Sequence, residues 1–189
     1  MPLEKLTRAR VVEALNLLGE LAELEQVTLE LCIFGGSAMM LAYRARETTK
    51  DVDVIAKPAE VAHRLAHAVA ERLALHDSWL NNDVRRFVSI EGTFATLEIQ
   101  ELESAGRRRL KITRPSAKYL LAMKCLAARS GLPGHPGDLE DISFLVRKME
   151  IRSVEEVERN LQRFYPQETL TPKVRELIQN ILAPRTEPQ

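Results

Sequence analysis

The sequence predicts an α+β fold in which a small mixed β-sheet is flanked by helices and followed by a C-terminal helical bundle. Three observations predict it. Apolar residues recur at helical spacing near the N-terminus, two short aliphatic runs follow with a helical segment between them, and the chain beyond Pro115 has helical periodicity. We therefore expect an α/β core over residues 1–114 and a helical region over residues 115–189 that packs on this core.

The first part of the chain predicts alternating helices and strands. Apolar residues three or four positions apart indicate a helix over 4–25, and the β-branched, apolar run over 27–34 indicates a buried strand. A short helix rich in Ala and Met is expected over 37–44. The sequence DVDVIA over 51–56 alternates acidic and aliphatic residues, which is typical of a strand with two different faces. Pro58 then opens the next helix, because its fixed φ suits a first turn.

The region that follows is expected to add three strands before the remaining helices begin. Strands are predicted over 86–90, 94–100 and 108–113, with turns at 91–92 and 104–106. Helices are expected over 116–129, 137–148, 154–164 and 172–182, with a Gly- and Pro-rich break over 131–137 and a frayed tail over 184–189. This order of strands followed by helices assigns the chain to the α+β class.

The composition narrows the classes of function. Lys+Arg and Asp+Glu number 27 each, so the formal net charge is zero and no global attraction to nucleic acid or membrane follows. Cys32 and Cys125 both lie in apolar runs and are interpreted as buried free thiols. The N-terminal segment is charged and amphipathic, and no stretch approaches membrane-spanning length. We therefore expect a cytoplasmic protein with no membrane partner.

A candidate phosphate site lies at Gly35-Gly36-Ser37, where a buried strand is followed directly by a helix. Glycines at such a junction let the backbone approach a ligand closely. The N–H groups at the start of the helix, together with the Ser37 hydroxyl, can hold a phosphate. The same three residues could equally form a simple turn.

A candidate metal site lies at Asp51 and Asp53, which are one residue apart on a predicted strand. Both carboxylates should project from one face of that strand. Two like charges side by side repel each other, and a divalent cation would offset this cost. Magnesium prefers carboxylate oxygens and is completed by water and substrate phosphates. The alternative is an exposed strand edge with two solvated acids.

Taken together, the two motifs resemble the signature of the polymerase-β-type nucleotidyltransferases, which is Gly-Gly/Ser after a strand, a short helix, and an acid-x-acid pair on the next strand. The lead-in from Arg46 to Thr49-Lys50-Asp51 is similar to the minimal bacterial members, including the AbiEii-like toxins of toxin–antitoxin pairs. The resemblance implies a nucleotidyltransferase fold and magnesium-dependent transfer of a nucleotidyl group from an NTP to a hydroxyl. It also implies tRNA or a protein as acceptor, and a cognate antitoxin as partner.

The resemblance also implies a third carboxylate on a later strand, as metal ligand or as base for the attacking hydroxyl. Glu98 is the best candidate, because it lies between apolar residues on a predicted strand. Lys124 lies in the apolar run LLAMKCLAA, where a buried charge must be paired or functional. It could bind a phosphate of the nucleotide, pair with Asp141, or extend to solvent from a helix edge. Asp141 is assigned together with Lys124 to the nucleotide-binding residues. Asp138, one turn before Asp141, could simply cap its helix.

Two other functions stay open from the sequence. The chain could bind a nucleotide without turning it over, as a regulatory protein on the same fold. Alternatively, it could be an RNA-binding adaptor in which the basic run Arg107–Lys111 contacts phosphates. That run could also be a charged edge strand that prevents aggregation.

Overall fold

The computed structural model describes residues 5–128 and 136–183. Arg129, most of the predicted Gly- and Pro-rich break and the predicted frayed tail lie outside these described residues. The chain divides into two compact units, and each is described by itself below. The first comprises Met1–Val88 and Phe94–Pro115, and the second comprises Ser89–Thr93 and Ser116–Gln189.

The first unit is built on a five-stranded mixed sheet with the strand order β5-β4-β2-β7-β6. Strand β2 runs antiparallel to β4 and parallel to β7, while β4 and β5 are parallel and β6 and β7 are antiparallel. The strands of this sheet are β2 (Leu29–Ile33), β4 (Val52–Lys57), β5 (Leu80–Asn81), β6 (Phe94–Thr96) and β7 (Leu110–Pro115). A separate antiparallel pair joins β1 (Leu6–Thr7) to β3 (Thr48–Thr49).

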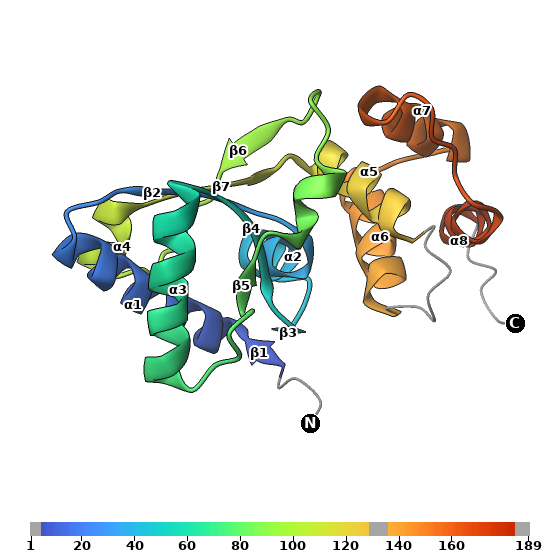
Figure 1. Cartoon of the computed structure of the whole chain (residues 1–189). Helices are drawn as coiled ribbons and strands as arrows, with labels where there is room; N and C mark the ends of the chain where they lie inside the picture. The colour runs from blue at the N-terminus through green and yellow to red at the C-terminus, as the bar shows by residue number, and fades with distance from the viewer. Residues whose placement is uncertain (1–4, 129–135, 184–189) are drawn as a thin grey trace, which may run out of the picture. The chain divides into compact units, whose positions relative to one another are not determined.

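Helices cover one face of this sheet. The helical segments of the unit are α1 (Arg8–Leu24), α2 (Gly35–Tyr43), α3 (Ala59–Leu73), the 3-10 helix η1 (Asp83–Phe87) and α4 (Ser104–Arg109). Figure 1 shows α1, α3 and α4 gathered on one side of the sheet. The strand residues that project into the core are buried, and they include Leu31, Ile33, Val52, Val54 and Ile112. The expected alternation along DVDVIA is therefore confirmed, because Val52 and Val54 lie in the core.

The opposite face of the sheet is the more exposed one. It carries half-buried side chains from three strands, namely Cys32 of β2, Asp53 and Ile55 of β4, and Thr113 of β7, and an exposed Thr96 on β6. Side chains alternate between the two faces of a strand, so these residues share a face with one another and not with the core. One of the two predicted metal ligands is thus on the accessible side of the sheet.

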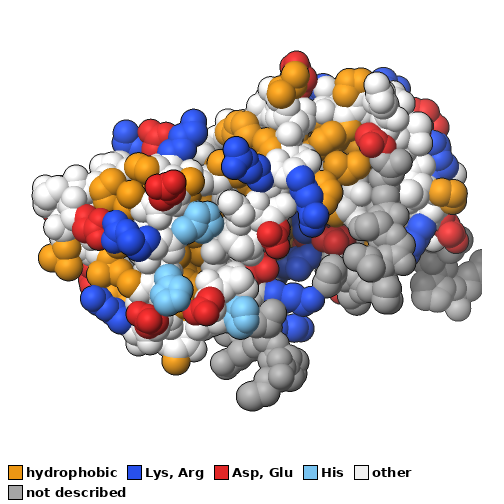
Figure 2. Space-filling model, viewed as in Figure 1, with side chains coloured by type: hydrophobic (Ala, Val, Ile, Leu, Met, Phe, Trp, Pro, Cys, Tyr) orange, Lys and Arg blue, Asp and Glu red, His pale blue; other side chains and the backbone are white. Residues whose placement is uncertain are grey.

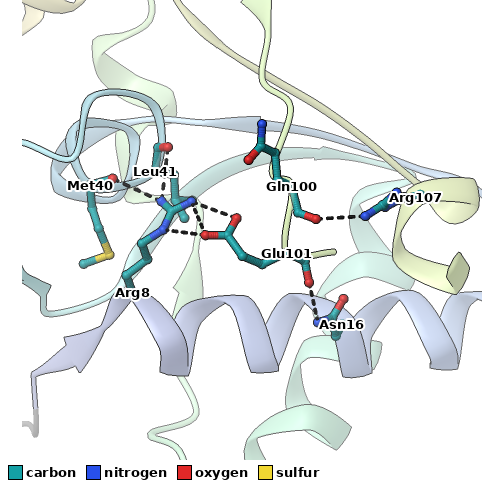
Figure 3. A network of polar contacts seen from close by, with 7 residues as sticks. All are labelled: Arg8, Asn16, Met40, Leu41, Gln100, Glu101 and Arg107. Atoms are coloured by element: carbon teal, nitrogen blue, oxygen red, sulfur yellow. Dashed lines mark hydrogen bonds and ion pairs between the residues drawn. The ribbon is translucent and has the colours of Figure 1, made fainter. Parts of the chain in front are cut away.

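Arg8 links three segments of the first unit (Figure 3). Its guanidinium donates to the carbonyls of Met40 and Leu41, at 3.3 and 3.2 Å, and so satisfies carbonyls near the end of α2. The same group forms an ion pair of 3.0 Å with Glu101. The pKa of Glu101 lies below its ordinary value, because the carboxylate accepts a hydrogen bond from the backbone N–H of Glu101 and, as the second cause, from the Arg8 guanidinium. The network fixes α1 against α2 and against the segment after β6.

The sequence-based prediction is wrong over much of 86–113. Part of the predicted strand 86–90 belongs to η1, the predicted strand 94–100 is regular only over β6, and the predicted turn at 104–106 begins α4. Helix α4 packs closely on α1, since a Cβ added at Gly19 would overlap the backbone of Gly106. This long-range contact decides the conformation of the segment, and local turn residues do not reveal it.

The second unit consists of helices together with the short segment Ser89–Thr93. The expected helices of the C-terminal region are confirmed as α5 (Ala117–Ala127), α6 (Pro136–Lys148), α7 (Val154–Phe164) and α8 (Pro172–Leu182). The side chains of Ser116, Ser153 and Thr171 cap α5, α7 and α8 by accepting hydrogen bonds from the first turn. No helix among the described residues is both long and apolar enough to cross a membrane.

Candidate functional site

The ends of β2 and β4 bring the two predicted motifs together. Phe34 follows β2, and its N–H donates to the carbonyl of Asp53 at 2.9 Å. Helix α2 begins at the next residue, Gly35. The start of the helix and the Asp-Val-Asp segment therefore lie side by side.

Gly35 is in direct contact with the carboxylate of Asp53. A Cβ added at Gly35 would lie 2.5 Å from Oδ2 of Asp53, and the residue has a φ of +60°. A side chain here would have to displace that carboxylate, and the backbone conformation would strain it as well. The carboxylate of the candidate metal ligand thus touches the first turn of the candidate phosphate-binding helix.

The second glycine brings two further side chains to the same place. A Cβ at Gly36 would lie 3.0 Å from Oγ1 of Thr49 and 3.1 Å from Nη1 of Arg46. A guanidinium beside the N-terminus of a helix adds positive charge where the helix dipole is already positive. Thr49 in turn donates to the carbonyl of Asp51 at 3.0 Å. These contacts unite the lead-in residues with both motifs.

Buried hydrogen bonds hold the backbone of the Asp pair from the other side. The N–H of Val52 donates to the carbonyl of Trp79 at 2.6 Å. Trp79 is itself fixed in the core, where its indole N–H donates to the carbonyl of Ala66 at 2.9 Å. Trp79 is therefore a structural support for the Asp pair, as a buried indole with a satisfied N–H usually is.

The donor set at this site fits magnesium. Two carboxylates are a sufficient protein contribution, because Mg²⁺ keeps several waters and takes substrate phosphates as its other ligands. Across residues 5–128 and 136–183, the structure contains no group of three or more His, Cys, Asp or Glu side chains that could hold a metal ion. An all-protein metal cage is thus not found in the described chain, and a site shared with a phosphate ligand would rely on Asp51 and Asp53.

The Ser37 hydroxyl is buried and bonded to the preceding turn. Its Oγ donates to the carbonyl of Phe34 at 2.8 Å, and the residue is 0% exposed. A short side chain at this position of a helix bonds easily to the preceding turn, and here that bond uses the hydroxyl. The candidate phosphate site is therefore formed by backbone N–H groups of the first turn of α2.

Glu98 lies far from the Asp pair. Glu98 is exposed and follows the end of β6. The N–H of Leu97 donates to the carbonyl of Ile112, so the pairing of β6 with β7 continues beyond β6. This pairing puts Glu98 opposite Lys111. Lys111 of β7 pairs with Glu30 of β2, and Glu30 pairs with Lys57 of β4. Lys57 lies four residues beyond Asp53 on the same strand. Strand geometry then separates Glu98 from Asp53 by about 13 Å along the strands and about 14 Å across them. The expectation that Glu98 completes the site is not supported.

Asn81 is a neighbour of the Asp pair that the sequence hardly indicates. It pairs with Asp53 across the parallel strands β4 and β5. Its Oδ1 accepts the N–H of Asp83 at 3.0 Å, which forms a local turn. The WLNND segment carries few strand-forming residues, so neither β5 nor this register could be predicted from it.

Lys124 and Asp141 belong to the second unit, where they bind each other. The Lys124 ammonium lies 2.8 Å from Oδ2 of Asp141 and 2.7 Å from Oδ1 of Asp138. Lys124 is 7% exposed and Asp141 is 1% exposed. The alternative of an ion pair with Asp141 is thus realised, and Asp138 joins it. The role of Lys124 and Asp141 in nucleotide binding stays a prediction.

The basic run Arg107–Lys111 is largely occupied by contacts within the first unit. Arg107 donates to the carbonyls of Leu102 and Gln100, and Arg109 pairs with Glu23 at 2.6 Å. Over this unit, the face drawn in Figure 2 shows Lys and Arg side chains lying among Asp and Glu side chains. These contacts disfavour an RNA-binding adaptor that depends on this run, because phosphate binding would have to displace internal partners.

The two thiols are poor nucleophiles. Burial raises the pKa of Cys32 to about 11, against a smaller lowering by a hydrogen bond with Thr113. Burial alone raises the pKa of Cys125 to about 12. Because the thiolate is the reactive form, neither residue supports cysteine chemistry at neutral pH.

We expect Gly35→Ala to disturb both the fold and the site. A positive φ costs a residue with a Cβ about 1–2 kcal/mol, and the added methyl would displace the Asp53 carboxylate. Magnesium-dependent NTP binding, measured by calorimetry, should weaken together with the free energy of unfolding. Ala38→Gly, later in the same helix, is the control: it should cost a similar stability and leave NTP binding intact. Equal NTP binding by both variants would contradict the contact assigned to Gly35.

Comparisons with known proteins relate this chain to nucleotidyltransferases and nucleotidyltransferase-like proteins. The family model described as "Nucleotidyltransferase of unknown function (DUF6036)" matches residues 10–166. A solved structure, that of an antigenic nucleotidyltransferase-like protein from Paracoccidioides brasiliensis, is similar over 93% of this chain and 95% of that chain, with 15% identity and a TM-score of 0.49. No curated protein matches significantly. Because the family model spans the whole of the site and most of the helical region, the chain belongs to the DUF6036 family of nucleotidyltransferases of unknown function.

Proposed function

We propose that this protein is a magnesium-dependent nucleotidyltransferase that moves a nucleotidyl group from an NTP to a hydroxyl acceptor. Membership in a nucleotidyltransferase family supports the class of reaction. The resemblance to AbiEii-like toxins makes tRNA or a protein hydroxyl the acceptor to test first, and a cognate antitoxin the partner.

One observation carries the proposal, namely the contact between Gly35 and the Asp53 carboxylate. It places a carboxylate that can hold magnesium against the helix terminus that can hold phosphate. A nucleoside triphosphate bound at this point would meet both in one site.

Each residue then has a defined task. The backbone N–H groups at the start of α2 bind the triphosphate, and Arg46 adds a positive charge beside Gly36. Asp51 and Asp53 would hold magnesium, which when bound neutralises charge on the phosphates. The contacts of Thr49 and Trp79 hold the backbone on either side of these carboxylates. Positioning and electrostatic stabilisation of this kind account for most of the catalysis in such transfers.

A second candidate function is nucleotide binding without turnover. It is favoured by the position of Glu98, which is too far from Asp51 and Asp53 to share a metal ion with them at ligand distances of about 2.1 Å. Under this alternative the site at Gly35 and Asp53 would bind an NTP and magnesium, but no group would be transferred.

The experiment that tests the proposal incubates the protein with each α-labelled NTP, magnesium, and either total tRNA or cell protein. We expect label in one acceptor class, and we expect the same NTP labelled at the γ-phosphate to leave no label there. Absence of transfer together with magnesium-dependent NTP binding would select the non-catalytic alternative. Absence of NTP binding would refute the site altogether.

A further inference from the structure

An exposed aromatic ring lies at the same end of the sheet as the proposed phosphate site. We propose that Phe94, the first residue of β6, is the surface on which the base of the bound nucleotide stacks. This inference rests on the proposed function, because it assumes that a nucleotide binds at the start of α2, beside the Asp pair.

The register of the sheet places Phe94 in the row that contains Asp53. The Phe34 N–H bond to the carbonyl of Asp53 pairs these two residues across β2 and β4. The register of β2 with β7, extended by two residues, puts Phe34 opposite Pro115, and Pro115 pairs with Phe94. Residues in one row project to the same face of a sheet. Phe94 therefore shares with Phe34 and Asp53 the face of the sheet opposite to the one that carries Ile33 and Val54.

The spacing suits a nucleotide whose phosphates lie at the start of α2. Helix α2 begins directly after β2, and β7 is the one strand between β2 and β6. At the usual distance between strands, about 10 Å separate the end of β2 from Phe94. A base linked through its ribose to phosphates at Gly35 has to extend across the sheet by this kind of distance.

The ring of Phe94 is held in place and yet accessible. Its centroid lies 6.2 Å from that of Phe34, with an interplanar angle of 84°, which is the favoured edge-to-face arrangement. Phe34 is completely buried and holds one side of the Phe94 ring by this contact, while Phe94 itself remains 46% exposed. Bases stack readily on such rings, because every base has an aromatic face.

The test compares a ligand that carries a nucleobase with a ligand that consists of phosphates alone. The affinities of NTP and of inorganic tripolyphosphate, each with magnesium, are measured by calorimetry for the wild type, Phe94→Ala and Phe94→Trp. We expect Phe94→Ala to weaken NTP binding at least about fivefold and to leave tripolyphosphate binding unchanged. Phe94→Trp should restore NTP binding. Leu24→Ala, at an exposed apolar residue near the end of α1, is the control and should change neither affinity.

Three other outcomes would overturn the inference, and each has a different meaning for the proposed function. Equal NTP affinity in the wild type and Phe94→Ala, with tripolyphosphate bound, would show that the base lies elsewhere and would leave the proposed function intact. Equal weakening of both ligands would show that Phe94 only supports the fold around Phe34. If the wild type binds neither ligand in the presence of magnesium, the proposed function fails, and this inference fails with it.

Discussion

Asp53→Asn is expected to reduce nucleotidyl transfer at least about 100-fold, because contacts to a catalytic metal contribute several kcal/mol and 1.36 kcal/mol is a factor of ten. The substitution keeps the shape of the side chain, so its contact with Gly35 should survive. Asp51→Asn should have a similar effect. The measurement is the initial rate of transfer from α-labelled NTP at saturating acceptor, with magnesium varied.

The control for this prediction is Asp77→Asn in the same unit. Asp77 is an exposed carboxylate whose side chain is 77% accessible, and we expect the variant to keep the activity of the wild type. The unfolding midpoints of Asp53→Asn and the wild type are measured in parallel, so that a loss of activity is separated from a loss of the fold. A rate within threefold of the wild type would show that Asp53 does not hold the metal.

The second large effect is expected on stability. Lys124→Met should lower the free energy of unfolding by about 3–5 kcal/mol, the usual cost of breaking a buried ion pair by removal of one partner. The substitution leaves the carboxylate of Asp141 buried, beside that of Asp138, without the ammonium that now lies 2.8 Å from it. Urea denaturation followed by circular dichroism measures this loss.

Two further variants make the interpretation specific. Lys118→Met removes an exposed lysine from the same helix and should change stability by no more than about 0.5 kcal/mol. The double variant Lys124→Met/Asp141→Leu should recover part of the loss, because it also removes the buried carboxylate that has lost the ammonium beside it. A loss below about 1 kcal/mol for Lys124→Met would mean that the Asp138 and Asp141 carboxylates find other partners.

Much of the fold could be predicted because local patterns decide it. The β-branched run before Gly35 and the alternation around Val52 and Val54 describe strands with a buried face, and the structure places both strands in the sheet. The later helices begin at residues such as Ser153 and Thr171, whose side chains cap them. In these segments, local preference and tertiary packing agree.

The candidate site could be predicted only where its parts are close in sequence. Gly35, Gly36, Asp51 and Asp53 lie within one strand–helix–strand segment, and the bond between Phe34 and Asp53 joins the two motifs within it. The sequence did not show that the Ser37 hydroxyl donates to the carbonyl of Phe34, and a role of this group in phosphate binding stays a prediction. Spacing reveals which residues can meet, but it does not reveal how each polar group is satisfied.

By itself, the sequence determined the class of fold, the strand–helix–strand segment and the relation to nucleotidyltransferases, because each depends on short-range patterns of residue type. The tertiary structure alone decided the order of the strands and their register. In that register, Glu98 lies far from Asp53, while Asn81 and Phe94 lie in the same row across the sheet as Asp53. The physical reason is that a slip of two residues, or the exchange of one neighbouring strand, keeps the same side chains on the buried face but alters every contact across the sheet.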